Sequence, residues 1–123
     1  AASDVYKRQV VRWRNQNGLA ARVYRHLRRT EYDQWPTLLA LAGQMGASPS
    51  SFRRQLEREG CSFQQIKDEV RRAMAFECLR DSDLSVAEIA AQTGFQEPSA
   101  FHRAFKKWTG ESPGSYRQRV SLP

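Results

Sequence analysis

An approximate internal repeat constrains the fold of this chain more than any other feature. The first copy reads LALAGQMGASPSSFRRQLEREG, from Leu39 to Gly60, and the second reads AEIAAQTGFQEPSAFHRAFKKWTG, from Ala87 to Gly110. The copies lie about 49 residues apart, and each has a short apolar-periodic segment, a glycine-containing turn and a longer segment with basic residues. This order is typical of a helix-turn-helix, whose second helix enters a groove of DNA.

The composition agrees with a nucleic-acid partner. The chain has 123 residues, with 20 Lys and Arg against 13 Asp and Glu, which gives a formal net charge of +7. A basic balance favours a polyanion, and nucleic acid before a membrane. Hydrophobic residues make up 40%, an ordinary share for a globular protein, which argues against wholesale disorder. No apolar run approaches the roughly 18 residues of a membrane-spanning helix, and no secretory signal is visible.

The sequence offers no residue pattern for catalysis or metal binding. Its two cysteines, Cys61 and Cys78, form no CxxC, and only two histidines, His26 and His102, are present to join them. A structural zinc site needs four ligands at metal spacing, so we expect no metal, no cofactor and reduced thiols. These side chains have no evident catalytic partners, and no phosphate-binding loop or paired acidic site is visible. We therefore predict that the chain is not an enzyme.

Apolar spacing and helix-boundary residues predict an all-α fold. Pro49 and Pro98 stand at first helical positions, and the segments beginning at Ser62 and Ser85 match capping boxes. No segment shows convincing strand alternation. We expect helices over residues 19–29, 36–44, 49–59, 63–80, 86–92, 98–108 and 113–119. The long helix between the repeats would span about 27 Å, and neighbouring major-groove segments on one face of DNA lie about 34 Å apart. The length of this helix is therefore compatible with a spacer between two DNA-reading units.

The chain is expected to hold one folded module behind a short leader. Its first residues, AASDVYKRQ, look like a translated sequencing adapter, the alternative being a native linker. We interpret residues 1–18 as a linker or non-native leader and expect the chain to be a fragment. The folded module is predicted over 19–119, with a first helix-turn-helix unit at 19–60, a linker helix at 62–80, a second unit at 84–119 and a tail at 120–123.

The longer segment of each repeat has an apolar side and a basic side. At about 100° per residue, Phe52 and Leu56 define the buried side of the first, as Phe101 and Phe105 do in the second. Taken singly, such a pattern usually marks a solvated, salt-bridged helix. The coincidence of turn, cap, buried pair and basic cluster in both copies favours DNA recognition instead. The outward positions are Ser50, Arg53, Arg54, Glu57 and Arg58 in the first copy and Ser99, His102, Arg103, Lys106 and Lys107 in the second.

These outward side chains have the chemistry that duplex DNA requires. Arginine can donate two hydrogen bonds to guanine O6 and N7, and a lysine or arginine on a phosphate positions a protein without specifying sequence. We assign Arg58, Lys106 and Lys107 to phosphates. Glu57 would either accept from cytosine N4 or hold an arginine in place, and we favour the second role. Nearby aromatic residues suggest single-strand stacking, but their helical spacing favours core packing: Phe95, Phe101, Phe105 and Trp108.

The second repeat and its flanks, SVAEIAAQTGFQEPSAFHRAFKKWTGESPGSYR from Ser85 to Arg117, closely resemble the signature of the AraC/XylS family of bacterial transcription regulators. The resemblance extends over about residues 19–119. It implies a seven-helix domain in which two homeodomain-like helix-turn-helix subdomains are joined by a long linker helix. It also implies sequence-specific binding of double-stranded promoter DNA, with two recognition helices in successive major-groove segments. The stretch from Ser62 to Arg71 resembles the same stretch in one branch of the family. The full-length proteins of that branch carry an N-terminal arabinose-binding-type domain, which is absent here.

The resemblance further implies particular contacts and partners. Pro98 falls at a base-contacting position but lacks a polar side chain, so only apolar or backbone contact is open to it. The base-contacting candidates carried over by position are Ser50, Arg53 and Arg54 in the first unit and Pro98, Ser99, His102 and Arg103 in the second. The resemblance also implies contact with RNA polymerase, transcriptional activation and a cytoplasmic, nucleoid-associated location without membrane contact. The isolated domain would be monomeric, and the full-length protein dimeric.

An alternative function is a helical protein-interaction module whose basic faces meet an acidic partner. Such a module would show neither salt-steep binding to duplex DNA nor a preference among DNA sequences.

Overall fold

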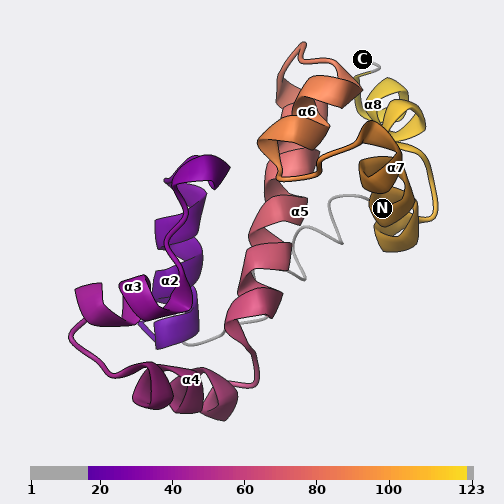
Figure 1. Ribbon diagram of the computed structural model, residues 1–123. Helices are drawn as coiled ribbons and strands as arrows, with labels where there is room; N and C mark the ends of the chain where they lie inside the picture. The colour runs from indigo at the N-terminus through magenta and orange to yellow at the C-terminus, as the bar shows by residue number, and fades with distance from the viewer. Residues whose placement is uncertain (1–16, 122–123) are drawn as a thin grey trace. The chain divides into compact units, whose positions relative to one another are not determined.

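The computed structural model describes residues 17–121, and in this range it contains seven α-helices, one 3₁₀ helix and no strand (Figure 1). The predicted all-α, seven-helix fold is therefore confirmed. Most of the leader predicted over 1–18 lies outside the described residues. The elements are α2 (Leu19–Arg28), η1 (Tyr32–Gln34), α3 (Leu38–Gln44), α4 (Pro49–Arg58), α5 (Phe63–Asp81), α6 (Val86–Gln92), α7 (Pro98–Thr109) and α8 (Pro113–Ser121).

Side-chain caps set the beginnings of several helices. The Ser48 hydroxyl accepts the backbone amide of Ser51 at the start of α4, and Pro49 occupies the first turn. Ser85 and Glu88 form a reciprocal capping box at the start of α6. The starts of these two helices were predicted, because a cap is a local sequence signal. Other helix ends differ from the prediction by one or two residues. The helix α3 begins at Leu38 and not at 36, because Thr37 is its N-cap, while α2 and α4 end earlier and α5, α7 and α8 extend further.

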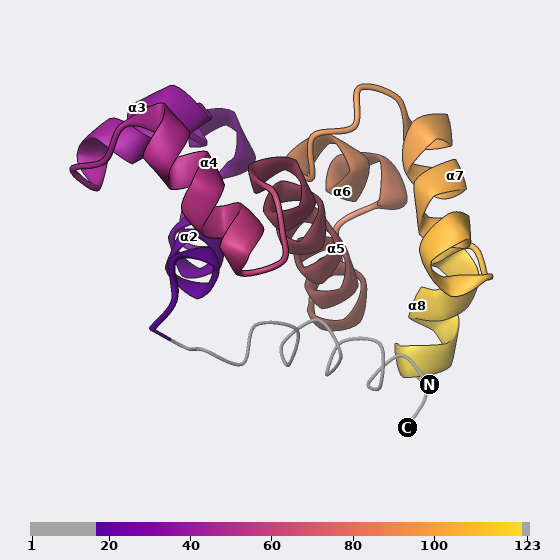
Figure 2. The ribbon, with the colours of Figure 1, turned by 90° about the horizontal axis from the view of Figure 1, so that it is seen from below.

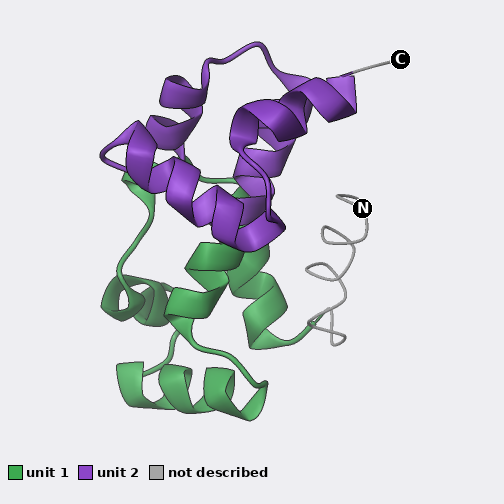
Figure 3. Cartoon of the chain, turned by 90° about the vertical axis from the view of Figure 1, so that its right-hand side faces the viewer, with its two compact units in different colours: residues 1, 3–70 green, residues 2, 71–123 purple. Residues whose placement is uncertain are grey.

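The chain divides into two compact units that meet in sequence between Val70 and Arg71, inside α5 (Figure 3). The first unit contains α2, α3, α4 and the beginning of α5. The second contains the remainder of α5 together with α6, α7 and α8. Figure 2 shows α3 beside α4 in the first unit and α7 beside α8 in the second, where the same pairs pack together. Each copy of the sequence repeat thus falls within its own unit.

The core of the first unit is largely aliphatic, with two buried phenylalanines, Phe52 of α4 and Phe63 of α5. Leu41 and Ala42 of α3 and Leu56 of α4 are buried, and these two helices pack together. The helices α2 and α5 supply the other fully buried side chains of this unit, which are Ala20, Val23, Leu27, Ile66 and Val70.

The core of the second unit contains a cluster of aromatic rings beside aliphatic side chains such as Leu79 and Ile89. Phe76 of α5 lies with its ring centroid 5.3 Å from Phe105 of α7 and 5.2 Å from Tyr116 of α8. Phe101 and Phe105 are completely buried, and Phe95 packs on Phe101 at 5.5 Å. Rings in such tilted pairs contribute about 0.5–1.5 kcal/mol beyond the burial of their area. The predicted core packing is confirmed for Phe101 and Phe105, whereas Phe95 and Trp108 pack against them but remain half-buried.

A glycine in a left-handed conformation makes the turn of each helix-turn-helix. Gly46, between α3 and α4, has a φ of 72°, and Gly94, between α6 and α7, has a φ of 88°. A side chain at such a φ clashes with the backbone, so glycine is the residue that makes the turn without strain. After each glycine the next backbone amide bonds back to the first helix, with Ala47 donating to Ala42 and Phe95 donating to Ala90, both at 2.9 Å.

Candidate nucleic-acid interface

The helix α4 presents a polar, mostly basic side to solvent. Phe52 and Leu56 each keep 1% of their surface exposed, and their burial turns the opposite side of the helix outward. Within residues 17–121, Arg53 and Arg54 form no ion pair or hydrogen bond through their side chains. All the outward positions predicted on this helix are exposed: Ser50, Arg53, Arg54, Glu57 and Arg58.

Glu57 lies among these arginines without an ion pair to any of them in the described part of the chain. The structure therefore does not show the arrangement that we favoured for Glu57, in which it holds an arginine in place. Among residues 17–121 the arginines of α4 are therefore unpaired and able to reach a ligand.

The helix α7 presents the corresponding surface in the second unit. Phe101 and Phe105 are fully buried, and Pro98 occupies the first turn. The sequence of α7, PSAFHRAFKKWT, contains no acidic residue, so nothing on this helix offsets its positive charge. The predicted positions on α7 are all exposed: Pro98, Ser99, His102, Arg103, Lys106 and Lys107.

A carboxylate from α4 holds that helix against α2. Glu59 follows the last residue of α4 and accepts the backbone amides of Leu19 and Ala20 at the start of α2, each at 3.0 Å. Gln55 donates to the same carboxylate at 3.0 Å. The end of α4 is thereby fixed to the unit through main-chain atoms of another helix. Sequence reasoning missed this contact, because Glu59 and Leu19 are far apart in the chain.

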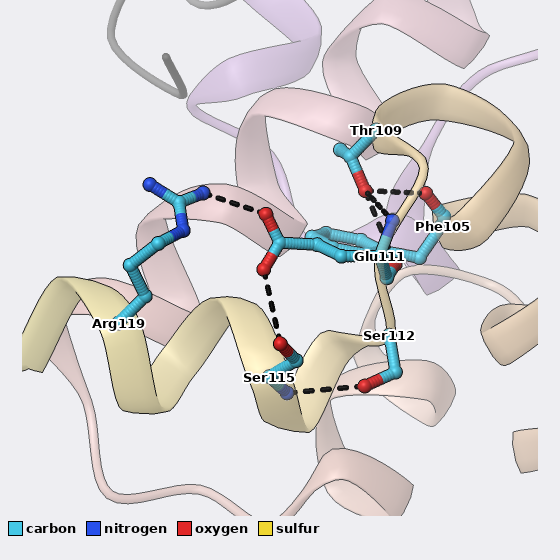
Figure 4. A network of polar contacts seen from close by, with 6 residues as sticks. All are labelled: Phe105, Thr109, Glu111, Ser112, Ser115 and Arg119. Atoms are coloured by element: carbon cyan, nitrogen blue, oxygen red, sulfur yellow. Dashed lines mark hydrogen bonds and ion pairs between the residues drawn. The ribbon is translucent and has the colours of Figure 1, made fainter.

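A polar network fixes the end of α7 to α8 (Figure 4). The Thr109 hydroxyl donates to the carbonyl of Phe105 at 2.9 Å and accepts the amide of Glu111 at 3.2 Å. The Glu111 carboxylate accepts from Arg119 at 2.7 Å and from Ser115 at 3.3 Å. The hydrogen bond from Arg119 lowers the pKa of the Glu111 carboxyl below its usual value.

A second arginine joins α8 to the end of α5. Arg117 donates to the backbone carbonyls of Leu79 at 3.1 Å, Cys78 at 3.2 Å and Ser82 at 3.1 Å. The last carbonyls of a helix have no partner within the helix, and a guanidinium can satisfy several at once. Arg117 therefore closes the second unit and is unavailable for DNA.

The described residues contain no group of three or more His, Cys, Asp or Glu side chains able to hold a metal ion. Cys61 is buried, and its thiol lies 3.6 Å from the carbonyl oxygen of Leu56. None of the helices over residues 17–121 combines the length and apolar character needed to cross a membrane.

Two units, each ending a short helix in a glycine turn and presenting a basic second helix, define a protein of the helix-turn-helix class. A protein-family model described as a helix-turn-helix domain matches residues 41–119. The chain belongs to this family, the AraC-type helix-turn-helix family of DNA-binding transcriptional regulators, as the resemblance had implied.

Individual relatives agree with this assignment. The ornithine utilization regulator of Pseudomonas aeruginosa is 41% identical over 103 residues, which are 84% of this chain and 30% of that protein. A crystallised DNA-binding transcriptional dual regulator from Escherichia coli K-12 has a TM-score of 0.77 at 25% identity, over 87% of this chain and 96% of that one. The DNA-binding domain of AdpA, crystallised with a target DNA, has a TM-score of 0.60 at 28% identity, over 84% of this chain and 93% of that one.

The chain spans about 30% of the length of its ornithine-regulator relative. These relatives are regulators by name, in agreement with the prediction that the chain is not an enzyme.

Proposed function

We propose that this chain binds double-stranded promoter DNA in a sequence-specific manner as the DNA-binding module, residues 19–119, of a bacterial transcription regulator. The two units would place α4 and α7 in successive major-groove segments. One observation carries the proposal: both helices stand at the same position of the repeat and present exposed cationic side chains opposite fully buried phenylalanines. A salt-bridged surface helix would pair those cations with acidic neighbours, and α7 has none on its own surface.

In this proposal the outward side chains divide into two groups by chemistry. Arginine reads guanine through a bidentate contact, which discriminates among bases by about 1–3 kcal/mol. The side chains assigned to base edges are Ser50, Arg53, Arg54, Pro98, Ser99, His102 and Arg103. Those assigned to phosphates are Arg58, Lys106 and Lys107, each of which would release a condensed counterion on binding.

Membership of the family supports a proposal about partners beyond DNA. We propose that the full protein contacts RNA polymerase and activates transcription from a cytoplasmic, nucleoid-associated position. The isolated module is proposed to be monomeric, because a chain with two recognition helices needs no second copy to contact two groove segments.

Selection from a random-sequence duplex pool tests the proposal. We expect a split motif with half-sites about one helical turn apart, and a steep fall in affinity as salt is raised. The protein-interaction alternative predicts no enriched motif and no salt-steep duplex binding. A pool that yields no motif would therefore rule out sequence-specific binding by this chain.

A further inference from the structure

The turn between α6 and α7 is held by a side chain from outside its own helix-turn-helix. Arg71 of α5 donates from Nε to the backbone carbonyl of Thr93 at 2.7 Å. Its guanidinium carbon lies 4.1 Å from the centroid of the Phe95 ring. One arginine therefore binds the residues on both sides of Gly94, by a charge-assisted hydrogen bond and by a cation–π contact.

The turn is in direct contact with the recognition helix of the second unit. Phe95 packs at 5.5 Å against Phe101, which is fully buried in α7, and at 6.2 Å against Trp108 near the end of that helix. Thr93 is also fully buried, and its hydroxyl donates back to the carbonyl of Ile89 at 2.8 Å. Phe95 therefore couples the turn to α7, because its ring packs on two side chains of that helix.

Within residues 17–121, no arginine makes the equivalent contact with the corresponding turn of the first unit. By the spacing of the repeat, Ala47 stands where the second turn has Phe95, and Met45 stands where it has Thr93. Alanine has no ring for a guanidinium to cover. The two turns otherwise match, since Ala47 and Phe95 make equivalent 2.9 Å backbone bonds. In the described part of the chain, the Arg71 contact is thus present at one of the two equivalent turns.

We propose that Arg71 is a positioning residue for DNA recognition, which sets the placement of α7 through the Thr93–Phe95 turn and so controls base readout by the second unit alone. This inference rests on the proposed DNA-binding function. Arg71 need not touch DNA to act in this way, because it acts through Phe95.

The two equivalent amides give a test that does not depend on DNA. Hydrogen exchange of the Phe95 and Ala47 amides is compared in the wild type, in Arg71→Met and in Arg80→Met. Methionine keeps an unbranched side chain but carries no charge. Arg80 lies on the same helix, and its guanidinium bonds to the adjacent Asp81. We expect Arg71→Met to accelerate exchange at Phe95 by roughly tenfold and to leave Ala47 unchanged, and Arg80→Met to affect neither.

The same variants are then titrated with the selected duplex and with duplexes altered in only one half-site. Arg71→Met should lose roughly tenfold in discrimination at the second half-site and keep its discrimination at the first. Arg71→Lys should restore part of this loss, because an ammonium retains the charge but not the planar stacking of a guanidinium. The double variant Arg71→Met/Phe95→Leu should lose no more than the worse single variant, since both act through one contact.

A purely structural role predicts a different result. Equal acceleration at both amides, with equal loss at both half-sites, would mean general destabilisation and would overturn the positioning role. Unchanged Phe95 exchange in Arg71→Met would overturn it as well. If the wild type selects no DNA motif, the proposed function fails, and the role of Arg71 in base readout fails with it. The exchange data would then report only on the stability of the turn.

Discussion

The carboxylate of Glu59 accepts the backbone amide of Leu19 at 3.0 Å and so ties the end of α4 to the first residue of α2. Gly18 stands at the N-cap of α2 and has no side chain with which to cap it. Glu59 performs that function from a distant part of the chain. The same side chain therefore caps one helix and holds in place another that we assign to DNA.

Replacing Glu59 with alanine should lower the free energy of unfolding by about 1 kcal/mol, the usual loss when a helix cap is removed. Urea denaturation followed by circular dichroism measures the change. Glu57→Ala is the matched control, because Glu57 is exposed on the same helix and its loss should change stability by less than about 0.5 kcal/mol. Equal effects of the two substitutions would show that the contact with α2 contributes nothing.

The contribution of Glu59 should depend on pH. Burial raises the pKa of this carboxyl, but the hydrogen bonds from Gln55 and from the amides of Ala20 and Leu19 outweigh burial and lower the pKa. A lowered folded-state pKa means that the stabilisation is complete above the unfolded value of about 4.3 and is lost as the pH falls through the folded value. The stability difference between wild type and Glu59→Gln should therefore be constant from pH 7 to 5 and shrink below about pH 4.

Arg54→Ala and Arg103→Ala should relax different parts of the selected DNA motif. Each arginine is exposed on a different recognition helix, so each loss should cost about 1–3 kcal/mol of discrimination at its own half-site and little at the other. Repeating the duplex selection with each variant measures this. Relaxation of the same positions by both variants would contradict separate readout by the two helices.

Lys106→Ala and Lys107→Ala should weaken binding to all duplexes by similar factors, since phosphates carry no sequence information. Each loss should also reduce the slope of log affinity against log salt by about 0.9. Binding isotherms at several salt concentrations provide both quantities. A changed motif with an unchanged salt slope would instead place the lysine at a base edge.

Gly46→Ala should destabilise the first unit by roughly 1–2 kcal/mol, the cost of a left-handed conformation for an L residue. The φ of Gly46 is 72°, and a β-carbon there would meet no atom within 4 Å, so the cost is conformational rather than steric crowding with neighbours. Gly43→Ala is the control, because Gly43 lies inside α3 with equally open space and should gain about 0.5–1 kcal/mol. Thermal unfolding of the two variants should shift in opposite directions.

The sequence alone predicts the helices and their outward faces because both depend on neighbouring residues. Ser48, Ser85 and Pro98 mark helix starts within one turn of the helix they begin. The alternation of buried and exposed positions on α4 and α7 follows from the helical period, so the phenylalanines and the basic residues sort to opposite sides. The repeat predicts the helix-turn-helix arrangement, because two copies with the same pattern are expected to adopt the same conformation.

The contacts that hold these helices in place could not be predicted in the same way. Arg71 reaches Thr93 across 22 positions and Arg117 reaches Leu79 across 38, and the residues between them say nothing about either pairing. Trp35 lies beyond the end of α2, and its indole donates back to the carbonyls of Leu27 at 3.1 Å and Thr30 at 2.9 Å. Such bonds depend on how helices pack, which local periodicity does not encode.

The two copies of the motif are secured by opposite charges, an acidic side chain at Leu19 and Ala20 and a guanidinium at Thr93 and Phe95. A substitution that loosens one has no counterpart to disturb in the other. A substitution of Glu59 acts on the contact between α4 and α2, whereas a substitution of Arg71 acts on the turn before α7. The placement of α4 and that of α7 therefore depend on different side chains, and each can be altered separately.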